Sequence, residues 1–344
     1  MIQQHGGNIG QLRDILDFSA NINPLGAPES VKRAIVESID CAEKYPDPYC
    51  SELYDRLAER ESISVKNIVC GNGADDLIFR IVHALKPKKA MVCAPTFTEY
   101  SRALAEVGCE ILEHILAESR DFELGEDILP KLDSSLDMFF ICTPNNPSGR
   151  LAAPEILANI AKKCSEKKII LVCDECFMDF VNNSESYSLR QFLNENCIIL
   201  KAFTKLYAMP GIRLGYAVCG SSHIAERIQE SGQFWSVSSL AQAAGIAALD
   251  ETDYVDETVR YISEERRFLA AEIAKIGVKV YSGTANFLLF KSRAGLAEEL
   301  LSQGILIRDC ENFSGLTEGF YRVAVRTHEE NIRLITALRR CLNG

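Results

Sequence analysis

The chain has 344 residues, 47% of them hydrophobic and 25% charged, so it can bury a large core and is not expected to be disordered. That length exceeds what one compact core usually holds, and it favours two domains of unequal size. The formal net charge of −11 disfavours nucleic acid as a partner, because an acidic protein and a phosphate backbone repel each other.

Residues 1–7 have neither the basic nor the apolar region of a signal peptide, and no apolar stretch reaches the roughly 18 residues of a membrane span. We therefore expect a cytoplasmic protein with no membrane contact. Most of the thirteen cysteines should then be buried, reduced thiols. Cys173 and Cys176 spell C-x-x-C, but without a second pair this spacing predicts neither a metal site nor a redox site.

Residues 1–25 show no strong hydrophobic period, and we expect an N-terminal arm there that packs near the functional site with the smaller domain. From residue 26 to 240, short apolar runs alternate with amphipathic stretches such as Glu99–Val107 and Pro154–Glu166. This alternation predicts an α/β domain whose mainly parallel sheet lies between layers of helices. The runs expected to be strands are Ala90–Cys93, Met138–Cys142, Ile169–Cys173, Ile198–Leu200 and Gly215–Cys219.

Residues 241–344 have a different pattern, which predicts a smaller α+β domain. The alanine-rich segment Leu240–Leu249 leads into a long polar helix that ends near Ile276. A last helix opens at Thr327, where Glu330 completes a capping box. The runs expected to be strands are Val278–Tyr281, Asn286–Phe290, Ile305–Arg308 and Tyr321–Val325.

Ligands of open α/β sheets bind beyond the carboxyl ends of the strands, so the residues after each run are the candidates for a site. Lys205 follows the run Ile198–Leu200, with Thr204 beside it and Arg213 a little further on. A hydroxyl and a guanidinium together suit a phosphate group, and an amine next to such a pair suits pyridoxal 5′-phosphate. A lone lysine at this place is more often a solvated surface charge.

Asp174 follows the run Ile169–Cys173 and, as a carboxylate at a buried strand end, must be paired. It could form a salt bridge, cap a helix, or contact the ring nitrogen of pyridoxal phosphate and so keep the ring an electron sink. Asn146 lies in the turn-like segment Thr143–Gly149 and becomes a candidate donor to the oxygen on that ring.

Two further segments are open to both a structural and a functional interpretation. Gly71–Asp76 runs straight into an apolar helix, so it is either a plain turn or a set of backbone N–H groups that bind an anion. Phe97, after the run Ala90–Cys93, is either a core residue or a ring that stacks on a planar cofactor.

Five motifs together carry a resemblance that covers nearly the whole chain. They are GNGAD, APTF, TPNNPSG, CDECF and FTKLYAMPGIRLGY, in this order. A chain with these motifs resembles the class I/II aminotransferases, which have the pyridoxal-phosphate-dependent transferase fold type I. The segments HGGN and SANINPLG are similar to those of the threonine-phosphate decarboxylase branch of cobalamin biosynthesis, with the histidinol-phosphate aminotransferases close behind.

The resemblance implies a role for each matching residue. Lys205 would hold the cofactor as a Schiff base, with Asp174 at the ring nitrogen, Asn146 at the ring oxygen and Phe97 stacked on the ring. The cofactor phosphate would be bound by Gly73, Ala74, Asp75, Thr204 and Arg213. Tyr45 would reach that phosphate in the neighbouring subunit, which implies a homodimer with shared active sites. A small phosphorylated amino-acid substrate would be bound by His5, Gly6, Asn21, Asn146, Arg308 and Arg322.

Two positions depart from the usual family pattern. Ala202 replaces a serine whose hydroxyl commonly binds the cofactor phosphate, and Phe177 replaces a tyrosine that commonly binds the ring oxygen; the decarboxylase branch resembles this chain in having Phe there. The expected reaction is decarboxylation of O-phospho-L-threonine to (R)-1-aminopropan-2-ol O-phosphate. The alternatives are transamination of histidinol phosphate, decarboxylation of O-phosphoserine, and a regulator that binds the cofactor without catalysis.

Overall fold

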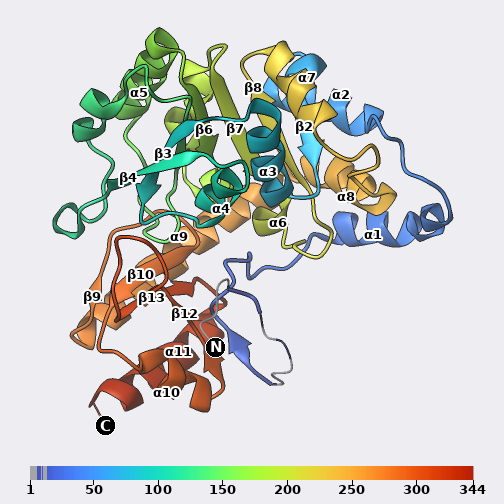
Figure 1. Cartoon of the computed structure of the whole chain (residues 1–344). Coiled ribbons are helices and arrows are strands. Elements are labelled where there is room, and N and C mark those ends of the chain that lie inside the picture. Colours follow the sequence, from blue (N-terminus) through green and yellow to red (C-terminus); the bar gives the residue numbers. More distant parts are fainter. Residues whose placement is uncertain (1–5, 9, 11–13, 344) are drawn as a thin grey trace.

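A seven-stranded sheet lies at the centre of the larger unit (Figure 1). The computed structural model describes residues 6–8, 10 and 14–343. The strand order is β2-β8-β7-β6-β5-β3-β4, and β8 is antiparallel to both of its neighbours while the other neighbouring pairs are parallel. The bounds are β2 Ile68–Gly71, β3 Lys89–Ala94, β4 Glu110–Ile115, β5 Met138–Cys142, β6 Ile170–Asp174, β7 Cys197–Ala202 and β8 Gly215–Cys219. The prediction of a mainly parallel sheet is confirmed.

Both faces of this sheet are buried, because apolar side chains alternate between two cores along each strand. In β5, Phe139 and Ile141 belong to one core, whereas Met138 and Phe140 belong to the other. The first core is covered by α1 Glu29–Glu37, α2 Ser51–Glu61, α5 Pro154–Lys167 and α8 Ser239–Leu249. The second core is covered by α3 Ala74–Leu85, α4 Glu99–Glu106 and α7 Ser222–Glu230.

The smaller unit holds an antiparallel sheet in the order β12-β13-β10-β9 and a short parallel pair, β1 with β11. The run expected to be one strand, Ile305–Arg308, is divided between these two sheets, because Ile305 pairs with Leu16 of the N-terminal segment and Arg308 pairs with Arg322. The bounds are β1 Leu16–Asp17, β9 Lys279–Val280, β10 Phe287–Lys291, β11 Ile305–Leu306, β12 Arg308–Asp309 and β13 Phe320–Ala324.

Three helices complete this unit: α9 Thr252–Lys275, α10 Leu296–Ser302 and α11 His328–Asn343. The capping box predicted at the start of the last helix is present. The Thr327 N–H donates to Glu330 Oε2 at 3.1 Å, and the Glu330 N–H donates to Thr327 Oγ1 at 3.4 Å. Such reciprocal bonds satisfy N–H groups that have no partner inside the helix.

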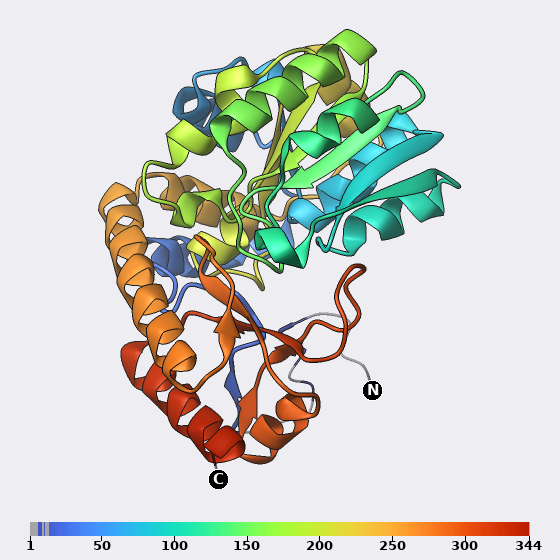
Figure 2. The same ribbon diagram turned by 90° about the vertical axis from the view of Figure 1, so that its left-hand side faces the viewer.

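The long helix α9 connects the two units and runs along one side of the molecule (Figure 2). Near its start, Tyr254 and Val255 pack against the first core, whereas Leu269 and Ile273 near its end belong to the core of the smaller unit. Helix α8 packs beside α1 and α2 in the larger unit, although the predicted boundary after residue 240 would assign most of it to the smaller domain. Among the described residues, no helix has the length and apolar character to span a bilayer.

Candidate active site

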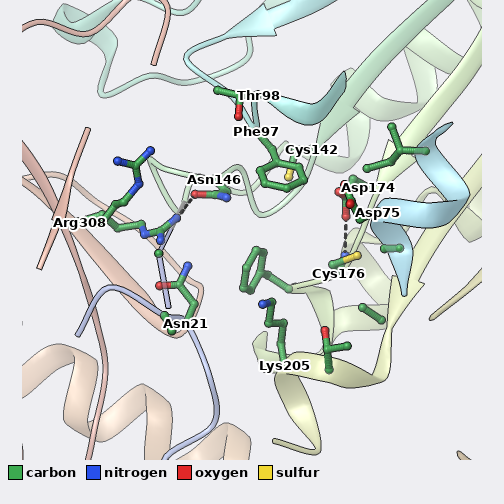
Figure 3. A pocket seen from close by; sticks show the side chains of 18 of the residues that line it. Asn21, Asp75, Phe97, Thr98, Cys142, Asn146, Asp174, Cys176, Lys205 and Arg308 are labelled. Carbon is green, nitrogen blue, oxygen red and sulfur yellow. Dashed lines mark hydrogen bonds between the residues drawn. The ribbon is translucent and has the colours of Figure 1, made fainter. Parts of the chain in front are cut away.

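A pocket of about 380 Å³ lies where the carboxyl ends of β5, β6 and β7 face the smaller unit. Its volume is within the range of small-molecule sites in enzymes. The pocket is lined by most of the residues predicted from the sequence (Figure 3): Gly6, Asn21, Ala74, Asp75, Phe97, Asn146, Asp174, Thr204, Lys205, Arg213, Arg308 and Arg322.

Two predicted residues that the structure describes, Gly73 and Tyr45, do not line it. Gly73 lies directly before the pocket residue Ala74. Tyr45 is 78% exposed and stacks on Trp235, with the ring centroids 4.3 Å apart. His5 lies outside the described residues. The position of Tyr45 suits the prediction that it serves a neighbouring subunit, which stays a prediction.

Lys205 lies in the single turn α6 Phe203–Leu206, which follows β7 directly, so the strand end fixes where the amine stands. The pKa of Lys205 is lowered to about 8, chiefly by burial; Arg322 and Arg213 contribute to the lowering, while Cys176 and Asp174 oppose it. An amine with this pKa is partly neutral near neutral pH, as an amine that attacks a carbonyl must be.

Asp174 ends β6 and is 5% exposed. Its Oδ1 accepts a hydrogen bond of 2.9 Å from the Cys176 N–H, and its Oδ2 accepts one of 2.6 Å from the Tyr100 hydroxyl (Figure 3 shows the first). Both oxygens are therefore held, and the carboxylate keeps one orientation at the wall of the pocket. A buried, fixed carboxylate suits the nitrogen of a pyridinium ring.

The N-terminus of α3 forms a third wall and suits a phosphate group. Its first residues, Ala74 and Asp75, line the pocket, and the helix is long enough to carry a substantial positive end. Gly215 of the neighbouring strand allows this approach, because a Cβ there would lie 2.6 Å from the Ala74 nitrogen. The side chains of Thr204 and Arg213 complete the cradle from the other side.

Two arginines of β12 and β13 extend into the pocket from the smaller unit. Arg322 is 5% exposed; its Nη2 donates to the Ser19 carbonyl at 2.8 Å, and its Nη1 donates to Asn146 Oδ1. Arg308 is 2% exposed; it lies over the Phe313 ring at 5.1 Å, and its Nη2 donates to Asn312 Oδ1 at 2.6 Å. Burial lowers the pKa of Arg322 to about 10, which still leaves it charged at neutral pH.

These groups fit pyridoxal phosphate. Lys205, Asp174 and the cradle of α3 supply an amine, a carboxylate and an anion site around one cavity. Two buried polar atoms, Asn21 Oδ1 and Arg322 Nε, form no hydrogen bond with any described residue. Because a buried polar atom normally has a partner, these two atoms indicate a ligand with polar groups of its own.

Some pocket residues were not predicted from the sequence. Tyr100 lies three residues after Phe97, in the first turn of α4, and this closeness in sequence is the only signal that could have suggested it. Phe313 belongs to the loop between β12 and β13, where no pattern marks it. Cys176 lines the pocket while Cys173 is packed in the first core, so the two do not form a pair, and all thirteen cysteines are free thiols.

The two positions that depart from the family pattern both line the pocket. Ala202 ends β7 and is 7% exposed, so the site has a methyl group where a hydroxyl is usual. Phe177 packs edge-on against Phe287, with the ring centroids 5.0 Å apart. Neither side chain can donate a hydrogen bond.

Comparison with known proteins gives one consistent family. Residues 13–338 match the family described as aminotransferase class I and II. The chain is 41% identical to the threonine-phosphate decarboxylase of Salmonella typhimurium, over 99% of this chain and 97% of that one. It is 32% identical to the adenosylcobalamin biosynthesis bifunctional protein CobDQ of Leptospira interrogans, over 100% of this chain and 41% of that protein.

A crystal structure gives the same result for the fold. The histidinol-phosphate aminotransferase from Clostridium acetobutylicum has a TM-score of 0.89 and 32% sequence identity, covering 96% of this chain and 99% of that chain. The chain is therefore a member of the class I and II aminotransferase family, and its cofactor is pyridoxal 5′-phosphate.

Proposed function

We propose that this enzyme decarboxylates O-phospho-L-threonine to (R)-1-aminopropan-2-ol O-phosphate, for cobalamin biosynthesis. The observation that carries the proposal is the pair of buried arginines, Arg308 and Arg322, in the same pocket as Lys205. Two buried cations suit a substrate with two anionic groups, here a carboxylate and a phosphate. The similarity to the Salmonella typhimurium decarboxylase over nearly the full length supports the same reaction.

When bound, pyridoxal phosphate withdraws electrons from the bond at the substrate Cα that stands perpendicular to its ring. The protein's part is to decide which bond that is. Arg322 is held by hydrogen bonds to Asn146 and to the Ser19 carbonyl, so it can bind the substrate carboxylate at a fixed position. Arg308 is held by Asn312 and can grip the phosphate. Two fixed anchors prevent rotation about Cα.

Lys205 supplies the proton step. Once the carboxylate has left as CO₂, Cα needs a proton, and a positioned amine with a pKa near the working pH suits this transfer. Burial places the pKa of Lys205 at about 8, within that range. The Lys205 ammonium would donate to Cα from the wall of the pocket.

The test measures CO₂ release from O-phospho-L-threonine by the holoenzyme, next to transamination of histidinol phosphate with 2-oxoglutarate. Decarboxylation of O-phosphothreonine as the faster reaction is expected. Transamination as the faster reaction would favour the alternative, which has support in the 32% identity to an aminotransferase of that substrate. O-Phosphoserine differs by one methyl group, for which an apolar pocket discriminates by only about 10- to 200-fold, so it belongs in the same assay. Binding without any turnover would indicate a regulator.

We also propose a cytoplasmic homodimer with shared active sites. Tyr45, Tyr49, Phe234 and Trp235 form an exposed aromatic patch, each at least 47% exposed. Contiguous exposed apolar side chains are typical of protein interfaces. Sedimentation should give a dimer for the wild type and a smaller species for Trp235→Glu. Tyr45→Phe should remain dimeric but bind the cofactor more weakly; unchanged affinity would remove Tyr45 from the shared site.

A further inference from the structure

Tyr100 connects the cofactor site to the core of the larger unit. It lies in the first turn of α4 and is fully buried, at 0% exposed. Its hydroxyl donates to Asp174 Oδ2 at 2.6 Å, across 74 residues of sequence. This hydroxyl is one of the two donors that hold Asp174, the other being the Cys176 N–H at 2.9 Å.

The ring of Tyr100 is fixed as firmly as its hydroxyl. It stacks on Phe140 of β5, with ring centroids 5.1 Å apart and an angle of 12° between the planes. Phe97, a pocket residue, packs against the same ring in a T-shaped arrangement, with the ring centroids 5.7 Å apart and an angle of 80° between the planes. Tyr100 therefore contacts both Phe97 and Asp174, the two side chains predicted to contact the cofactor ring.

We propose that Tyr100 is the positioning residue of Asp174, holding its carboxylate in the orientation that meets the ring nitrogen of the cofactor. This proposal rests on the role of Asp174 in the proposed function. A carboxylate with a single donor can turn about its Cβ–Cγ bond, whereas donors on both oxygens leave one orientation.

The hydrogen bond keeps its proton on Tyr100. Burial and the negative charge of Asp174 raise the pKa of Tyr100 well above its usual value, so the phenol stays protonated and remains the donor. The hydroxyl is neutral, so its removal leaves the charge of the site unchanged. Tyr100→Phe therefore isolates the positioning effect.

The experiment compares Tyr100→Phe with Tyr281→Phe as a matched control. Tyr281 is also buried, at 1% exposed, and also donates to a carboxylate at 2.6 Å, that of Glu118, but it does not line the pocket. Each variant is measured for the dissociation constant of pyridoxal phosphate, for kcat and KM with O-phosphothreonine, and for thermal unfolding without cofactor.

For Tyr100→Phe we expect the dissociation constant of the cofactor to rise by about 10-fold and kcat to fall by about 10-fold, with KM changed by less than about 3-fold. Both variants should lower the unfolding temperature by similar amounts. Tyr281→Phe should change neither the dissociation constant of the cofactor nor kcat. Equal cofactor affinity in Tyr100→Phe and the wild type would overturn the proposal. Asp174→Asn separates the proposed role of Asp174 from that of Tyr100. If both Asp174→Asn and Tyr100→Phe bind the cofactor normally, the role of Asp174 fails. If Asp174→Asn binds it weakly and Tyr100→Phe binds it normally, only the role of Tyr100 fails.

Discussion

Gly73 and Arg213 are packed so closely that a side chain on the first would displace the second. A Cβ added to Gly73 would lie 2.7 Å from Arg213 Nη2. Gly73 also has a φ of +89° and a ψ of 166°, a conformation that side chains avoid. The backbone conformation therefore requires glycine at this position, and a side chain there would also shift the guanidinium of Arg213.

If Arg213 binds the cofactor phosphate, Gly73→Ala should weaken cofactor binding by about 10-fold, because the added Cβ shifts the guanidinium away from its place. Gly295 is a matched control, since it also precedes a helix with φ +78° but has no atom within 4 Å of an added Cβ. Gly295→Ala should reduce the free energy of unfolding without changing cofactor affinity. Equal affinity losses in both variants would mean that backbone strain, and not Arg213, is responsible.

The depressed pKa of Lys205 predicts how the stability of the cofactor-free protein depends on pH. The pKa falls from 10.5 to about 8 on folding, so between these values the folded chain binds fewer protons than the unfolded chain. The free energy of unfolding should therefore rise with pH across this window. Below about pH 8 both states carry the charge and its full burial cost is present.

Lys205→Met removes that cost, so the variant should be more stable than the wild type at about pH 7 and should lose this advantage as the pH approaches about 10. Urea unfolding of the two cofactor-free proteins at several pH values measures the difference. Lys66→Met, at an exposed position, serves as the control. Its free energy of unfolding should differ from that of the wild type by the same amount at every pH. A constant difference for Lys205→Met as well would contradict the depressed pKa.

The sequence predicted the sheet and the main pocket residues because their signals are local. Apolar runs mark buried strands, and Asp174 and Lys205 each follow such a run, so the rule of carboxyl strand ends brings them together. The assignment of roles needed the family resemblance as well. The bond from Arg322 to Asn146 joins residues 176 positions apart, and no local pattern indicates such a contact. The same holds for Tyr100 of helix α4, whose hydroxyl donates to Asp174 at the end of β6.

If Arg308 binds the phosphate of the substrate, as proposed above, its substitution should weaken substrate binding. Arg308→Gln should raise KM for O-phosphothreonine by about 10- to 100-fold, since a hydrogen bond to a charged group contributes about 1.5–3 kcal/mol. It should leave the residual activity on unphosphorylated threonine unchanged. Arg326→Gln is the control, because Arg326 also lies over an aromatic ring, that of Phe18, but does not line the pocket. A fall in kcat at constant KM would instead place Arg308 at the reacting atoms.

Ala202 offers a test in which function should improve. Ala202→Ser restores the hydroxyl that the family commonly has. The position lines the pocket, is 7% exposed, and is the last residue of β7, directly before Phe203 and Thr204. If the phosphate lies in the cradle of α3, this hydroxyl gains a charged acceptor, and the dissociation constant of the cofactor should fall by about 3- to 10-fold.

The same substitution at Ala152, which is 5% exposed in the first core, supplies the comparison. Ala152→Ser buries a hydroxyl among apolar side chains, so it should reduce the free energy of unfolding and leave cofactor affinity unchanged. Ala202→Ser should raise the unfolding temperature of the holoenzyme more than that of the cofactor-free protein, because the new bond exists only when the phosphate is present. Weaker cofactor binding in Ala202→Ser would show that the phosphate lies out of reach of β7, which would require another anion site in the pocket.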